Sequence, residues 1–444
     1  MPMQSGRPAV LETEALFTTA YGTVGDGVRD DAPPLQAALE DAAGRQLIVP
    51  PGVYRLGSTL RAPSGTRLQA QPGARFVLAD GVGQSTHDYL LTNRDHGIGN
   101  TDIEIRGGDW SGNTASNRRD GPILLPHGYS GVLMHFFNVR GLRVHGLTLR
   151  DAESYFFRMS RVRDFEISAI RFESAWPRDN NDGIHLGGEC EDGLIRHLRG
   201  VGAHVPNDDM VALNADDALD RVECQGLLCG PIRRIRIEDL EAEHGHSFVR
   251  LLSVRSPIED VHVRGIRGGC AISVLNMDAC RGCRIKLFDP EAGGASGGVG
   301  VVRRVTVEDV EVAKAEPGGG PLFRLEERAD QLVVRNVRRR TRPGVRDAEP
   351  TLQIRHVADH RFHLAGLTRK QARDARKFSR CPLHTSEALE SSRGHALTGK
   401  LVRRGRFQLP AGGFTEITMR QDHDALAEGT HHHDNAARTD SGSI

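Results

Sequence analysis

The chain contains few aromatic residues and no long apolar run. Phenylalanine, tryptophan and tyrosine together make up only 5% of the 444 residues. No apolar run approaches the ~18 residues that a membrane-spanning helix needs, so no contact with a membrane is expected. Residues 1–20 contain no basic region followed by an apolar run, and the sequence therefore predicts no signal peptide. We expect the protein to act in the cytoplasm.

Positive and negative residues are equal in number. The cysteines show no spacing typical of a disulfide framework. Lys+Arg and Asp+Glu both number 58, whereas general binding of nucleic acid needs a basic excess. Seven cysteines at irregular spacing indicate mostly free thiols in a reducing compartment. Cys280 and Cys283 have zinc-like spacing, but no second pair accompanies them, and His431-His432-His433 lies in a polar segment. The sequence therefore predicts no metal and no cofactor.

A short pattern of apolar residues, here called the apolar phrase, recurs along the chain. It reads apolar-x-apolar, then two residues, then apolar again, and the 51 glycines supply corners between the copies. Starts at Leu142 and Phe165 are 23 residues apart, and the next, at Leu194, follows after 29. One copy cannot bury its apolar stripe alone, so neighbouring copies must stack. We predict an all-β right-handed parallel β-helix, a solenoid. A β-sandwich would explain the strands but not the recurring phrase.

The remaining segments flank this repeat. Residues 1–16 are expected to form an N-terminal arm, and residues 17–364 the β-helix. Residues 34–43 have apolar side chains on one helical face and predict an N-terminal capping helix, since the open end of a repeat stack needs a cover. Residues 365–444 predict a polar, mobile tail, with a small hairpin at 407–409 and 414–417.

Two acidic clusters stand out within the repeat. Asn180-Asn181-Asp182-Gly183 and Asn207-Asp208-Asp209 each lead into an apolar segment, and Asp208 follows Asp182 by 26 residues, about one coil. Coils of a β-helix stack at the strand separation of about 4.8 Å. The carboxylates are therefore expected to be neighbours, and their repulsion would raise at least one pKa. The alternative is that these residues only form turns, but two clusters one coil apart favour catalysis.

These residues resemble the motifs of glycoside hydrolase family 28, the polygalacturonases and their relatives. That family carries Asn-Thr-Asp, Gly-Asp-Asp, Gly-His-Gly and Arg-Ile-Lys on neighbouring coils of a right-handed β-helix. Asn180-Asn181-Asp182 resembles the first motif with Asn181 for Thr, and Asn207-Asp208-Asp209 resembles the second with Asn207 for Gly. Gly245-His246-Ser247 resembles the third except for its last residue. Arg284-Ile285-Lys286 matches the fourth.

The resemblance implies inverting hydrolysis of galacturonan or a related acidic poly- or oligosaccharide. It implies that Asp208 or Asp209 donates a proton, with Asp208 favoured, that the other carboxylates including Asp182 activate water, and that His246 tunes or positions them. The expected substrate-binding residues are Asn180, Arg284, Lys286, Arg250 and Trp176, with Arg255 as a further candidate.

Several alternatives remain open at this stage. His244 competes with His246 for the same role. Residues 269–273 could take the place of the Arg-Ile-Lys motif and would lack both cations. The protein could be a Ca²⁺-dependent polysaccharide lyase, or a glycan-binding protein without catalytic activity that resembles a tailspike. The sequence leaves the oligomeric state undetermined.

Overall fold

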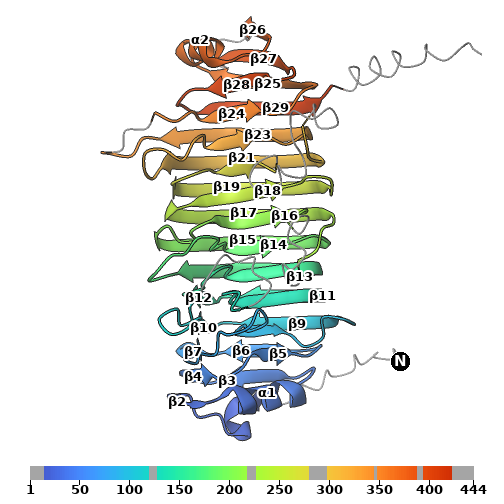
Figure 1. The fold of residues 1–444 in the computed structure, drawn as a ribbon, viewed down its shortest axis with the longest axis vertical. Helices are drawn as coiled ribbons and strands as arrows, with labels where there is room; N and C mark the ends of the chain where they lie inside the picture. Colours follow the sequence, from blue (N-terminus) through green and yellow to red (C-terminus); the bar gives the residue numbers. More distant parts are fainter. Residues whose placement is uncertain are drawn as a thin grey trace, which may run out of the picture.

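The protein folds into an elongated stack of parallel strands (Figure 1). The computed structural model describes residues 15–119, 128–217, 227–279, 298–344, 348–387 and 394–422. No helix in these ranges is long and apolar enough to cross a membrane. The predicted parallel β-helix is confirmed, because strands one coil apart in sequence pair in parallel register along the stack.

The recurring apolar phrases form the longest of three strand columns. Its members are β1 (Leu16–Phe17), β3 (Gln46–Val49), β6 (Arg67–Ala70), β9 (Asn100–Arg106), β11 (Met134–His145), β13 (Phe157–Glu173), β15 (Cys190–Ala203), β17 (Ile232–Gly245), β19 (Ile258–Cys270), β21 (Val302–Lys314) and β23 (Ala329–Arg340). A second column contains β2 (Asp26–Asp30), β4 (Gly52–Leu56), β7 (Ala74–Leu78), β10 (Asp109–Ser111) and β12 (Thr148–Arg150).

A third column of short strands carries the acidic clusters. It contains β5 (Leu60–Ala62), β8 (Leu91–Asn93), β14 (Ile184–Leu186), β16 (Asp209–Asn214), β18 (Ser247–Leu252), β20 (Leu275–Met277), β22 (Phe323–Leu325) and β24 (Leu352–Arg355), while the first residues of β11 and β13 complete it between β8 and β14. The site is therefore built by successive strand starts in this column.

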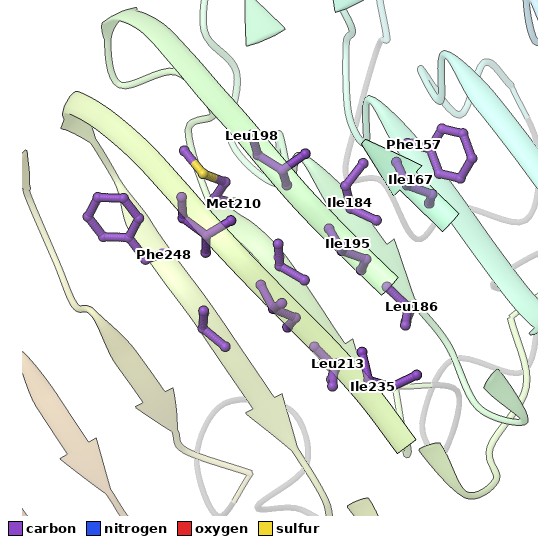
Figure 2. Packing of buried hydrophobic residues seen from close by; sticks show 14 of the residues in the cluster. Phe157, Ile167, Ile184, Leu186, Ile195, Leu198, Met210, Leu213, Ile235 and Phe248 are labelled. Carbon is purple, nitrogen blue, oxygen red and sulfur yellow. The ribbon is translucent and has the colours of Figure 1, made fainter. Parts of the chain in front are cut away.

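The inward side chains form ladders of like residues. Ile167, Ile195 and Ile237 occupy the same register position in β13, β15 and β17, and all three are fully buried. Figure 2 shows the apolar side chains around them between the strands. Burial of each such side chain contributes roughly 1.5–3 kcal/mol. The ladder holds every coil in one register, because a shift by one residue would turn the apolar side chains outward.

The predicted N-terminal capping helix is present as α1 (Ala32–Asp41), after the short 3-10 turn η1 (Thr18–Tyr21). Its buried face contains Leu35, Ala38 and Leu39, and it lies at the N-terminal end of the stack (Figure 1). Asp30 accepts the N–H of Ala32 at the start of the helix, at 3.0 Å.

The prediction of a polar, mobile tail from residue 365 is wrong for the described part of that segment. Residues 360–422 form β25 (His360–Leu367), α2 (Arg369–Phe378), β26 (Leu383–Glu387), β27 (His395–Leu401), β28 (Arg406–Leu409) and β29 (Phe414–Gln421). The expected hairpin does not form: β28 pairs antiparallel with β24, and β29 with β23 and β25. Leu364, Leu397 and Phe407 are buried and extend the core. The segment thus closes the C-terminal end of the stack.

Candidate functional site

The structure places the two acidic clusters on adjacent coils, as predicted. Ile184 of β14 pairs with Val211 of β16, so Asp182 stands opposite Asp209. The N–H of Gly183 donates to the Asp209 carbonyl at 2.9 Å. A Cβ at Gly183 would lie 2.5 Å from the Met210 carbonyl oxygen, so only glycine permits this close approach.

Asp182 is buried and paired with a histidine that the sequence analysis missed. Its Oδ2 lies 2.6 Å from Nδ1 of His185. The other ring nitrogen of His185 lies 3.5 Å from Asp217, and the imidazole stacks on Tyr155 with centroids 4.2 Å apart. The available signal was its position: His185 lies three residues after Asp182 and alternates with the apolar Ile184 and Leu186, although all three side chains are buried. Its contacts fix the orientation of the Asp182 carboxylate.

Asp208 is the accessible member of the acidic cluster. Its side chain is 22% exposed, whereas those of Asp182 and Asp209 are 5% and 2% exposed. Asn180 donates to Asp208 at 3.4 Å, and Nδ1 of His246 lies 3.8 Å from Oδ1 of Asp208. A molecule that approaches from solvent therefore meets Asp208 first.

His246, not His244, belongs to this site. Asp209 pairs with Ser247 across the next coil, which places His246 opposite Asp208. His244 lies instead beside Glu316, with Nε2 3.6 Å from the carboxylate. The register between β16 and β18 therefore places His246, and not His244, next to Asp208.

Arg250 supplies the positive charge inside the cluster. Its guanidinium donates to Asp278 at 2.7 Å and lies 3.9 Å from Asp209. The sequence analysis assigned Arg250 to substrate and did not identify Asp278. The observed contacts make Arg250 a counter-charge for Asp278 and Asp209, and binding of substrate by Arg250 stays a prediction.

Burial and mutual repulsion shift the carboxyl groups toward the protonated state. Burial, followed by the charge of Asp182, raises the pKa of Asp208 to about 7. Burial and the charge of Asp208 raise the pKa of Asp209 well above its usual value, although Arg250 opposes the shift. The cluster can therefore hold a proton at neutral pH beside an ionised carboxylate, a combination that acid–base catalysis requires.

Comparison with known proteins places this geometry in a recognised fold. No protein-family model matches the chain. A protein of Arabidopsis thaliana named "probable polygalacturonase" is 23% identical over 308 residues, 68% of this chain and 60% of the relative. The surface protein and adhesin PfbA of Streptococcus pneumoniae has a TM-score of 0.53 at 14% identity, over 78% of this chain and 90% of PfbA. The chain has a right-handed parallel β-helix fold.

An exopolygalacturonase of Thermotoga maritima is a further structural neighbour, with a TM-score of 0.47 at 14% identity, over 77% of this chain and 90% of that one. The chain thus matches less than two thirds of the length of its plant relative, while it matches most of each structural neighbour. At 14% identity, the likeness to PfbA shows the fold alone.

Among the described residues, neither Trp176 nor Arg255 makes a hydrogen bond or ion pair with the acidic cluster. Arg284 and Lys286 lie outside the described residues. Ile272 follows His246 on the next coil, with a backbone hydrogen bond of 2.8 Å, and carries no charge. Trp176 is 65% exposed, and the backbone N–H of Arg255 donates to Asp216 at 2.7 Å.

The contribution of Asp208 to folding stability is expected to fall as pH rises from about 4 to about 7. A carboxyl with a raised pKa binds its proton more tightly in the folded chain than in the unfolded chain, so its contribution is present at low pH and is lost as pH rises through the folded pKa. For Asp208 this shift, from 3.8 to about 7, amounts to at most roughly 4 kcal/mol. Urea unfolding of the protein and of Asp208→Asn at a series of pH values measures it. An unchanged pH slope in the variant would contradict the assignment.

Proposed function

We propose that the protein is a glycoside hydrolase that cleaves a glycosidic bond in a polysaccharide with inversion. The observation that carries the proposal is the arrangement of Asp208, accessible and with a pKa raised to about 7, beside the buried carboxylates Asp182 and Asp209. Inverting hydrolysis needs one carboxylic acid to protonate the leaving oxygen and one carboxylate to activate water.

The geometry supports a division of roles. Asp208 donates the proton, because it is the carboxyl that a sugar can reach, and its pKa of about 7 keeps it partly protonated at the pH where it must act. Asp182 and Asp209 hold the attacking water, and whichever of the two is ionised accepts its proton. Asn180 and His246 position Asp208, and Arg250 offsets the negative charge, so that at least one of the buried carboxyls is ionised.

The proposed substrate is a galacturonan or a related acidic poly- or oligosaccharide. The plant relative is named a polygalacturonase, and the residues around the clusters resemble that family. Trp176 offers an exposed ring on which a sugar face can stack. Arg284 and Lys286 are proposed to bind a uronate carboxylate, which an arginine can contact with two parallel hydrogen bonds.

A second candidate is glycan binding without turnover. It is favoured by the likeness to the adhesin, which covers 78% of this chain at a TM-score of 0.53. In that case the acidic cluster would be structural, and sugar would bind to the folded chain without being cleaved.

Product analysis separates these functions. The purified protein is incubated with a panel of pectic and other acidic glycans, and the first products are followed by proton NMR. We expect new reducing ends that appear first as the inverted anomer, because water attacks the face opposite the leaving group. Unsaturated uronate products that disappear with a chelator would identify a lyase, and binding without products would identify the adhesin-like function.

A further inference from the structure

A second cluster of potential ligands lies beside the acidic site. His204 follows β15, His244 lies in β17, and Glu316 follows β21. Nε2 of His204 is 3.4 Å from Oε2 of Glu316, and Nε2 of His244 is 3.6 Å from the same oxygen. One ligand atom from each residue lies within 4.8 Å of the other two.

These separations are too long for good hydrogen bonds but fit atoms that share one metal ion. Zn²⁺ binds nitrogen and oxygen at about 2.0–2.1 Å with tetrahedral angles, which places neighbouring ligand atoms roughly 3.3 Å apart. Nε2 of His244 is buried and makes no hydrogen bond within the described residues. A metal ion is a partner that would satisfy both imidazoles and the carboxylate together.

The fold brings Glu316 to the histidines across an intervening coil. The end of β19 lies between β17 and β21 and carries Gly268 and Gly269 instead of bulky side chains. A Cβ at Gly268 would lie 1.9 Å from the Ala242 carbonyl oxygen, and one at Gly269 would lie 2.5 Å from that of Glu243. The coils can approach closely here only because both residues are glycine.

We propose that His204, His244 and Glu316 bind a divalent transition-metal ion of the Zn²⁺ type. Two imidazoles select such an ion over Ca²⁺ or Mg²⁺, which prefer oxygen ligands. The side chains are 34%, 23% and 42% exposed, so an ion can enter from solvent. Three protein ligands leave at least one coordination position for water.

The bound ion ties together three separate coils close to the acidic site. His244 is two residues before His246, which faces Asp208. The ion therefore fixes the strand end that carries His246. The proposal does not depend on hydrolysis, because it concerns binding by residues outside the carboxylate cluster.

The test is metal binding by the full-length chain in which His431, His432 and His433 are replaced by Ala, since that run would bind the same ions. After dialysis against EDTA, Zn²⁺ is titrated by calorimetry, and Co²⁺ is added to record its visible absorption. We expect one site per chain, Co²⁺ bands of low coordination number, and a rise in melting temperature with Zn²⁺.

His204→Ala, His244→Ala and Glu316→Gln are each expected to weaken Zn²⁺ binding more than about tenfold. His262→Ala is the matched control, because His262 contacts a single carboxylate, Glu308, at 2.8 Å on the outer surface, and it should leave binding unchanged. Glu316→Gln preserves shape, so its loss of affinity cannot be ascribed to unfolding when circular dichroism is unchanged. The proposal is overturned if no Zn²⁺ binds, or if all three variants bind as the parent does.

Discussion

Asp208→Asn is expected to lower kcat by a factor on the order of 10² or more. The substitution keeps the shape of the side chain and removes the proton that the leaving oxygen needs. Asp182→Asn and Asp209→Asn should cause losses of the same order, since they remove the carboxylates that activate water. The three losses are not expected to add, because the groups act as one unit. Steady-state kinetics on the substrate identified by product analysis measures each effect.

The matched control is Asp192→Asn, an exposed aspartate of β15 that contacts Arg234 at 2.6 Å. It should leave kcat unchanged. Circular dichroism and melting curves should show that all four variants fold, because loss of carboxylate repulsion does not weaken the stack. Near-normal turnover in all three site variants would refute the catalytic assignment and favour the glycan-binding function.

Arg250→Met should destabilise the protein by about 3–5 kcal/mol, the usual cost of removing one partner of a buried ion pair. Arg250 contacts Asp278 and lies near Asp209, and both carboxylates would then lose this nearby positive charge. Denaturant unfolding at pH 7 measures the change in the free energy of unfolding. At lower pH the penalty should shrink, because the carboxyls can then bind protons.

Arg234→Met provides the comparison on the surface. Arg234 contacts two carboxylates, of Asp192 and Glu191, but it lies in solvent, where such pairs contribute little. Equal destabilisation by the two substitutions would show that burial does not govern the effect. A stable Arg250→Met variant would show that the acidic cluster is neutral in the folded chain and needs no counter-charge.

The repeating part of the fold could be predicted from the sequence, because the alternating apolar pattern in each copy predicts the strands of that coil. Asp182, Asp208 and Asp209 could be placed for the same reason: a separation near one coil becomes direct adjacency. The residues that contact these aspartates could not be predicted. Asp278 reaches the cluster through the Arg250 side chain, and side-chain reach has no regular spacing along the chain.

Prediction from the sequence fails for the same reason in the C-terminal segment and in the cluster of His204, His244 and Glu316. The described residues between 365 and 422 depart from the repeat. Two of their strands, β28 and β29, pair antiparallel with β24 and β23, and no local sequence pattern predicts this pairing. His204 and Glu316 are brought together across several coils, and the distance between them depends on Gly268 and Gly269. Such contacts depend on how closely neighbouring coils approach. The amino-acid composition and the length of the repeat do not determine that distance.

The antiparallel closure also determines how copies of the protein can meet. The last coil of the parallel stack, at β23, is already paired with β29 running in the opposite direction, while α1 lies across the other end (Figure 1). A second copy therefore cannot extend the ladder in parallel register from β23. Within the described residues, head-to-tail addition of a second copy on β23 is therefore blocked.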